Sequence, residues 1–119
     1  MEVAITKYEQ AVLLRIFIGE SDEFGGRPLH EAIVLKAREM GLAGATVLRG
    51  PMGFGRSSHL HTAKILRLSE DLPLVIEMVD AEENIDRLIA VTAEMLGSSL
   101  VTTEKVSVVR YGLGQGLKG

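Results

Sequence analysis

The chain has 119 residues, 46% of them hydrophobic, and a formal net charge of −3. This size predicts one domain, which we place at residues 1–111, followed by a flexible glycine-rich tail at residues 112–119. The absence of cysteine excludes disulfides and thiolate metal sites, and the acidic charge with only two tyrosines and three phenylalanines argues against a nucleic-acid-binding protein.

The apolar residues are distributed as in a protein that does not enter membranes. Residues 1–7 lack the apolar run of a signal peptide. Arg15 interrupts the strongest apolar run long before that run reaches the length of a membrane span. Together with the missing cysteines, these features predict a cytoplasmic protein without direct membrane insertion.

The first half of the chain predicts two strands and one helix. Residues 10–19 are rich in β-branched residues and are followed by a turn sequence, which is typical of a strand. A helix should begin near Pro28 and end at Gly41, because apolar residues recur between them at helical spacing. Residues 45–49 have the composition of a second strand.

The second half predicts two strands and another helix. Residues 74–79 follow a proline and form the third predicted strand. Asp80 and Glu83 have the spacing of a capping box, and an apolar stripe then predicts a helix that ends at Gly97. Residues 101–111 alternate as a fourth strand.

The resulting order, β-α-β-β-α-β, predicts a ferredoxin-like α+β fold. Its four-stranded antiparallel sheet should have the first and third strands in the centre and both helices on one face. The second face of these strands is also largely apolar, so we expect it to meet other subunits. Arg15 and Glu77 lie on that face, either as an ion pair within an interface or as an isolated surface bridge. The apolar residues of this face are Leu13, Phe17, Val75 and Val79.

The strongest chemical signal lies in the connection of about twenty residues between the second and third strands. Glycines let backbone N–H groups converge on an oxyanion, arginine offers a fork that matches phosphate, and serine hydroxyls supply further donors. We therefore predict an anion-binding segment, with a structural turn or a protein-contact loop as the alternative. Residues 63–68 alternate weakly and are predicted to extend as an arm. The candidate binding residues are Arg49, Gly50, Gly53, Phe54, Gly55, Arg56, Ser57, Ser58 and His59.

Three motifs that would predict a more specific ligand are rejected. Residues 50–57 have the spacing of a P-loop, but Arg56 stands where lysine is required and the next predicted strand is antiparallel. Residues 114–119 spell a dinucleotide fingerprint, but no helix follows them. His59 and His61 have no evident third ligand, so no metal is expected.

Catalysis is not expected from this sequence. Ser57, Ser58 and His59 are adjacent, and adjacent side chains rarely converge as a nucleophile and its base. The acidic turn at residues 20–23 has the composition of a paired-carboxylate site, but a solvated acidic turn is favoured. His30 is expected on the exposed first turn of the first helix.

Several further motifs occur in order along the chain. They are Leu14–Asp22, Arg27–Leu29 with Glu31–Ile33, Lys36–Val47, and Arg49–Gly50 with Met52–Gly55. In these motifs the chain through Tyr111 resembles an uncharacterised prokaryotic family classed with PII-like proteins. The resemblance implies a ferredoxin-like homotrimer with inward-facing sheets and with small effectors, often adenine nucleotides, in clefts between subunits.

The resemblance also implies roles for particular segments. The connection after Arg49 matches in position the T-loop by which PII proteins contact their targets. Residues 80–83 are acidic where PII proteins carry a glycine-rich loop with lysine, and an acidic helix start repels phosphate, so the PII mode of ATP binding is not carried over. We expect the phosphates near Arg49, residues 53–59 and Arg110, which occupies the family's C-terminal basic position.

From the residues and the resemblance together we predict a PII-like regulatory protein that is not an enzyme and has no cofactor. It should bind AMP, ADP or ATP between subunits and regulate a target protein, such as a membrane transporter or an enzyme, through residues 53–72. A trimeric protein-interaction module without a nucleotide is the alternative. Hydrolysis of a small phosphate ester is a minor alternative.

Overall fold

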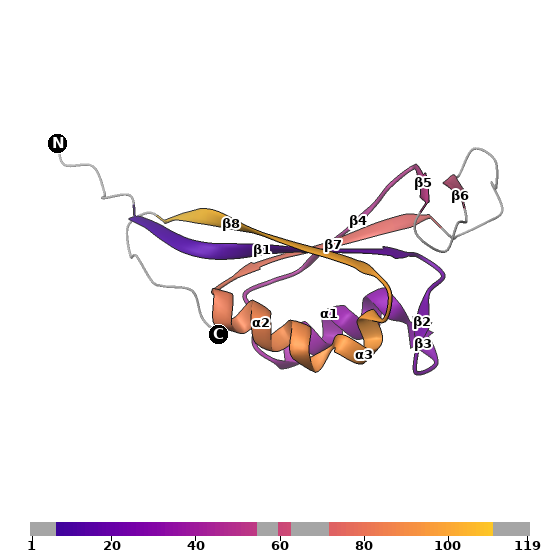
Figure 1. Ribbon diagram of the computed structural model, residues 1–119, viewed down its shortest axis with the longest axis horizontal. Helices are drawn as coiled ribbons and strands as arrows, with labels where there is room; N and C mark the ends of the chain where they lie inside the picture. Colours follow the sequence, from indigo (N-terminus) through magenta and orange to yellow (C-terminus); the bar gives the residue numbers. More distant parts are fainter. Residues whose placement is uncertain (1–6, 55–59, 63–71, 111–119) are drawn as a thin grey trace.

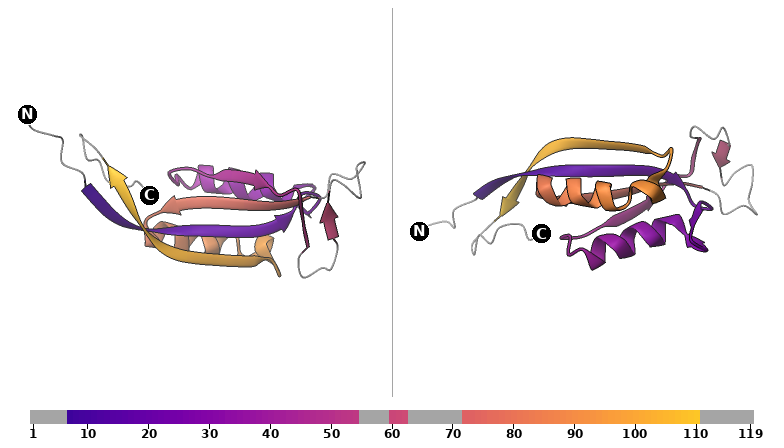
Figure 2. Two further views of the ribbon diagram at one scale, coloured as in Figure 1. Left: turned by 90° about the horizontal axis from the view of Figure 1, so that it is seen from above. Right: turned by 60° about the horizontal axis from the view of Figure 1, so that its bottom comes forward.

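The computed structural model describes residues 7–54, 60–62 and 72–110. Four strands form one antiparallel sheet in the order β4-β7-β1-β8, and the helices pack against one of its faces (Figures 1 and 2). The predicted ferredoxin-like arrangement, with the first and third predicted strands in the centre, is confirmed. The main elements are β1 (Lys7–Gly19), α1 (Leu29–Glu39), β4 (Thr46–Arg49), β7 (Pro73–Asp80), α2 (Glu82–Val91), α3 (Ala93–Leu96) and β8 (Leu100–Arg110).

Two small hairpins were not predicted from the sequence. β2 (Glu23–Phe24) pairs with β3 (Arg27–Pro28), and the two glycines between them have φ angles of 62° and 81°, which favour glycine. β5 (Met52–Phe54) pairs with β6 (Leu60–Thr62), so part of the predicted 53–72 loop is strand. The predicted arm at residues 63–68 and the predicted tail at residues 112–119 lie outside the described residues.

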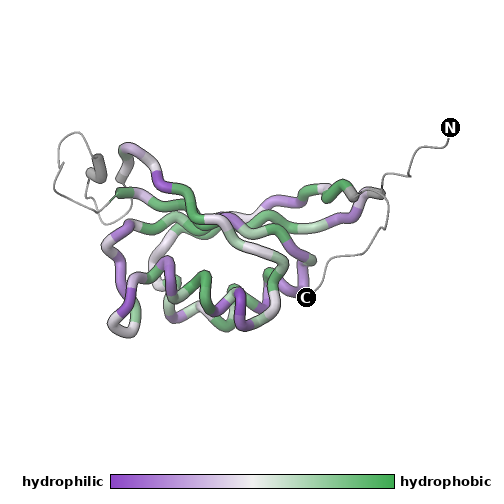
Figure 3. The backbone as a smooth tube through the Cα atoms, turned by 180° about the vertical axis from the view of Figure 1, so that it is seen from behind, coloured by the Kyte–Doolittle hydropathy of each residue, from purple (hydrophilic) through white to green (hydrophobic). Residues whose placement is uncertain are grey.

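The core lies between the sheet and the helices, as the period-two pattern of the strands requires. Alternate residues of β1 and β7 face the helices, and each helix contributes the apolar residues that recur along one side. Figure 3 shows hydrophobic residues recurring along the strands and between the polar stretches of the helices. The fully buried members of this core are Leu14, Ile16, Ile33, Ile76, Met78, Ile85 and Leu88.

The predicted capping box at the start of the second helix is wrong. Asp80 is the last residue of β7 and is fully buried, while Ala81 is the N-cap and makes no side-chain capping bond. The Asp80 carboxylate accepts hydrogen bonds from Ala81 N at 2.7 Å, from Asn84 Nδ2 at 2.8 Å and from Ala43 N at 2.8 Å. Because Ala43 precedes β4, this carboxylate joins three segments rather than capping one helix.

The second helix is also divided in two. α2 ends before Thr92 and α3 follows it, so the predicted single helix to Gly97 is interrupted. The Thr92 hydroxyl donates to the carbonyl oxygen of Leu88 at 2.7 Å, a local bond that competes with regular helix geometry.

The face of the sheet that the helices leave open carries the predicted ion pair. Arg15 Nε lies 2.9 Å from Glu77 Oε2, and Arg15 Nη1 lies 2.8 Å from Glu104 Oε1. Hydrogen bonding to Glu77 and then to Glu104 raises the pKa of the Arg15 guanidinium, so the cation keeps its charge. The predicted pairing of Arg15 with Glu77 is confirmed, and Glu104 is an additional partner.

Apolar side chains surround this charged cluster on the open face. Phe17 lies opposite Val75 on one side and opposite Leu100 on the other, while Leu13 lies opposite Val79. Within a single chain, 36% of Phe17 and 57% of Leu100 are exposed. The open face is therefore an apolar surface around one arginine that is paired with two glutamates, a composition that suits contact with protein.

Candidate functional site

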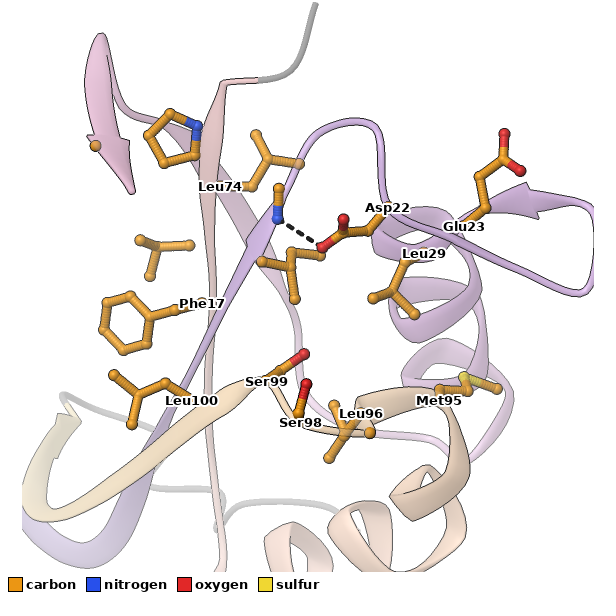
Figure 4. A pocket seen from close by; sticks show the side chains of 16 residues that line it. Phe17, Asp22, Glu23, Leu29, Leu74, Met95, Leu96, Ser98, Ser99 and Leu100 are labelled. Atoms are coloured by element: carbon orange, nitrogen blue, oxygen red, sulfur yellow. Dashed lines mark hydrogen bonds between the residues drawn. The ribbon is translucent and has the colours of Figure 1, made fainter. Parts of the chain in front are cut away.

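A cavity of about 660 Å³ lies at the end of the sheet where β1 ends, β7 begins and α3 turns into β8 (Figure 4). We call it the sheet-end pocket. Its volume lies in the range of small-molecule sites. Among its lining residues are the apolar side chains of Phe17, Ile18, Leu29, Leu74, Val75, Met95, Leu96 and Leu100.

The sheet-end pocket has walls from both faces of the sheet. Ile18 and Leu74 belong to the buried core under the helices. Phe17, Val75 and Leu100 belong to the open face, where they form one cross-strand row. A molecule packed on the open face would therefore also cover one wall of the pocket.

Polar groups line the other walls. Ser98 and Ser99 follow α3, Asp22 comes from the turn between β1 and β2, and Glu23 is the first residue of β2. Asp22 is part of the turn itself, because its Oδ2 accepts from Gly19 N at 2.9 Å. The described lining thus includes two carboxylates and no lysine, arginine or histidine.

Of the residues predicted to bind an anion, Gly53 lines the pocket. Gly50 N–H donates to the carbonyl oxygen of Pro73 at 2.8 Å, so this donor is used in strand pairing. A Cβ atom added at Gly50 would lie 3.1 Å from Pro73 Cγ, and one added at Gly53 would lie 3.2 Å from the same atom. Close packing against the proline ring therefore gives both glycines a structural role, independent of any ligand.

Arg49, the predicted phosphate ligand, is paired within the chain. Its Nη2 donates to Glu20 Oε2, and 60% of the arginine side chain stays exposed. Glu20 N also donates to the carbonyl oxygen of Leu72 at 2.8 Å. Glu20 therefore contacts residues at both ends of the connection between β4 and β7, a role that the sequence did not reveal.

For the remaining predicted binding residues, the structure describes no side chain. Gly55, Arg56, Ser57, Ser58 and His59 are not among the described residues, and of Phe54 and Arg110 the structure describes the backbone. Their part in a site stays a prediction.

The structure contradicts the prediction for His30 and leaves the prediction for His59 and His61 untested, because the side chains of these two residues are not described. His30 is half-buried rather than exposed, and its Nδ1 is buried without a hydrogen-bond partner among the described residues. The described part of the chain contains no group of three His, Cys, Asp or Glu side chains suited to a metal ion. Within the same ranges no helix combines the length and the apolar character that crossing a membrane requires.

Comparison with known proteins agrees with this architecture. Residues 11–108 match the family described as DUF190: Uncharacterized ACR, COG1993. A UPF0166 protein of Aquifex aeolicus (strain VF5) is 38% identical over 99 residues, which cover 82% of this chain and 91% of that protein.

Two solved structures of CPII, a nitrogen regulatory PII-like protein from Thiomonas intermedia K12, share the fold. One, bound to ADP and bicarbonate, superimposes with a TM-score of 0.65 at 17% identity, covering 87% of this chain and 93% of that chain. The other, bound to ADP, AMP and bicarbonate, has a TM-score of 0.66 at 17% identity, covering 87% and 92%. The likeness identifies the fold as PII-like.

Proposed function

Because this chain belongs to the DUF190 family and has a PII-like fold, we propose that it is a cytoplasmic regulatory protein that binds an adenine nucleotide between the subunits of a homotrimer. The observation that carries this proposal is the position of the sheet-end pocket. One of its walls, formed by Phe17, Val75 and Leu100, is part of the open apolar face. A second subunit on that face would complete the site.

The charges of the pocket decide how a nucleotide would lie in it. Two carboxylates without a cation repel phosphate, so the uncharged nucleoside end is the part that suits the described lining. Gly53 marks the side of the pocket where the connection begins. We place the phosphates toward that side, with Arg49 and residues 53–59 as the proposed donors. Arg110 of the same chain is not among them, because it lies opposite Lys7 at the far end of β8, whereas Leu100 at the other end lines the pocket.

We propose that the protein regulates a target protein, such as a membrane transporter or an enzyme, through residues 53–72. Glu20 supports this step, because it contacts Arg49 and Leu72 at the two ends of the connection. A phosphate that draws Arg49 away from Glu20 would change how this connection is held, and a partner would sense the change.

The second candidate is a trimeric interaction module without a nucleotide. The open apolar face favours it directly, since that surface suits a protein partner whether or not the pocket is filled. Hydrolysis of a phosphate ester has less support. Ser98 and Ser99 line the pocket, but its described lining offers no histidine, lysine or cysteine to activate or replace them. We therefore propose a role without catalysis.

Titration calorimetry of the purified protein with AMP, ADP, ATP and cyclic dinucleotides tests this proposal. At least one adenine nucleotide should bind, and Arg49→Ala should weaken that binding, because a phosphate donor is lost. If none of these compounds binds, the nucleotide proposal is wrong and the interaction module is the better account.

A further inference from the structure

We propose that Asp22 recognises the ribose of the bound nucleotide and makes the sheet-end pocket selective for ribonucleotides over deoxyribonucleotides. The inference rests on the proposed function, and it assigns to one carboxylate a role beyond holding its own turn. It follows from the position of Asp22, from the hydrogen bonds that the carboxylate already makes, and from the chemistry of the nucleoside.

The carboxylate of Asp22 is held in place by backbone groups around the pocket. Its Oδ2 accepts from Gly19 N at 2.9 Å, and the Asp22 backbone N–H donates to the Gly19 carbonyl oxygen at 3.1 Å. The Asp22 carbonyl oxygen accepts from Leu29 N at 2.7 Å, at the start of α1. These bonds anchor both the main chain and the side chain, so the carboxylate is preorganised for a ligand.

The same carboxylate still has acceptor capacity toward the pocket. A carboxylate offers two oxygens, and within the described residues the bond from Gly19 is made to Oδ2 alone. Figure 4 shows the Asp22 carboxylate directed toward the space, across from Ser98 and Ser99. A ligand in this space therefore meets an acceptor on one wall and hydroxyl groups on the other.

Among the parts of an adenine nucleotide, the ribose diol is the best match to this acceptor. The phosphates are anions and are repelled by a carboxylate, whereas a hydroxyl group donates a charge-assisted hydrogen bond to it. A carboxylate that accepts from a ribose 2′-hydroxyl is a recurrent solution in other nucleotide sites. The apolar walls formed by Leu29 and Leu96 are left for the base.

Glu23 is a poorer candidate although it also lines the pocket. Figure 4 shows its carboxylate directed away from the space that Asp22 faces. No hydrogen bond within the described residues is recorded for its carboxylate, so ordering that longer side chain on a ligand would cost more conformational entropy. Glu23→Gln is therefore a matched control that removes the same charge one residue away.

The test compares ADP with 2′-deoxy-ADP and 3′-deoxy-ADP by titration calorimetry on the full chain. Wild-type protein should bind ADP about tenfold more tightly than at least one of the deoxy analogues, the loss expected for one hydrogen bond to a charged group. Asp22→Asn keeps an oxygen for Gly19 N–H but replaces the other acceptor by a donor. In this variant the ratio of the affinity for ADP to the affinity for the deoxy analogue should be close to one, while Glu23→Gln should leave this ratio unchanged.

Three results would count against the inference, and they separate it from the proposed function. If wild-type protein binds ADP and both deoxy analogues equally, the function stands and the role of Asp22 is wrong. If Asp22→Asn still binds ADP more tightly than the deoxy analogue, another group recognises the ribose hydroxyl. If wild-type protein binds neither ADP nor any other adenine nucleotide, both proposals fail. The first comparison uses unaltered protein, so it does not depend on whether a variant folds.

Discussion

Arg49 at the end of β4 forms an ion pair with Glu20, directly after β1, although β7 lies between these two strands. The side chain of Glu20 is 16% exposed and that of Arg49 is 60% exposed, so the cation is accessible while its partner is mostly covered. An anionic ligand that uses Arg49 must therefore compete with a carboxylate of the same chain. Glu20 would lower the affinity for the ligand and couple its binding to the connection between β4 and β7.

Glu20→Gln should consequently raise the affinity for ADP by about two- to fivefold, the range that corresponds to an exposed ion pair. Arg49→Ala should lower the affinity, because the phosphate donor itself is lost. Calorimetry at one fixed low ionic strength measures both effects, since salt screens them. Glu39→Gln is the control: it breaks the Lys36–Glu39 pair on α1 and should change nothing. Unchanged affinity in both Glu20→Gln and Arg49→Ala would show that the phosphates lie elsewhere.

Phe17→Glu should dissociate the proposed trimer. Phe17 lies between Val75 and Leu100 on the open face, so the substitution places a charge among apolar side chains that a neighbouring subunit would cover. Leu35→Glu is the matched control, because Leu35 is exposed to 44% against 36% for Phe17 but lies on α1, in the opposite layer. Sedimentation velocity at equal concentrations distinguishes the two. A monomeric wild-type protein, or equal behaviour of both variants, contradicts the trimer.

Much of this fold could be predicted because local pattern and global packing agree. The alternation in β1 and β7 and the helical spacing in α1 locate their elements to within a few residues. The Arg15–Glu77 pair was predictable because both residues interrupt apolar runs on the same face. Glu104 was missed, since its register opposite Leu13 depends on the pairing of β1 with β8 rather than on local sequence.

The site was less accessible to sequence reasoning because its walls come from distant segments. The sequence pattern predicted that the glycines bind an anion, yet Gly50 and Gly53 pack on Pro73, a contact that sequence spacing does not encode. Asp22 belongs to an acidic turn that was expected to be solvated and is exposed, but its bond to Gly19 and its place in the pocket lining could not be predicted from the sequence. Asp80 had the pattern of a helix cap, but the chain buries it at the end of β7.

Asp80→Ala should lower the free energy of unfolding by about 2–3 kcal/mol, because buried donors lose their acceptor. Asn84 Nδ2 is the most affected, since Asn84 is itself buried, and Ala43 N loses its bond as well. Asp86→Ala on the exposed side of α2 removes the same charge without these bonds and should have little effect. Urea unfolding at one fixed protein concentration measures the difference, and equal stability of the two variants would mean that the carboxylate does not join the three segments.

The packing of Gly50 against Pro73 predicts a coupled pair of substitutions. Gly50→Ala should destabilise the protein by about 1 kcal/mol, because the new methyl group would lie 3.1 Å from Pro73 Cγ, closer than an ordinary van der Waals contact. Gly44→Ala is the control, since a Cβ at that position has no heavy atom within 4 Å and its backbone is not in the left-handed region. Pro73→Ala removes the ring, so Gly50→Ala introduced into that background should cost much less. Urea unfolding of the four proteins in this double-mutant cycle, at one concentration, gives the coupling energy. A coupling energy near zero would show that the ring moves aside without cost. The glycine at position 50 would then be better explained by ligand binding than by packing against Pro73.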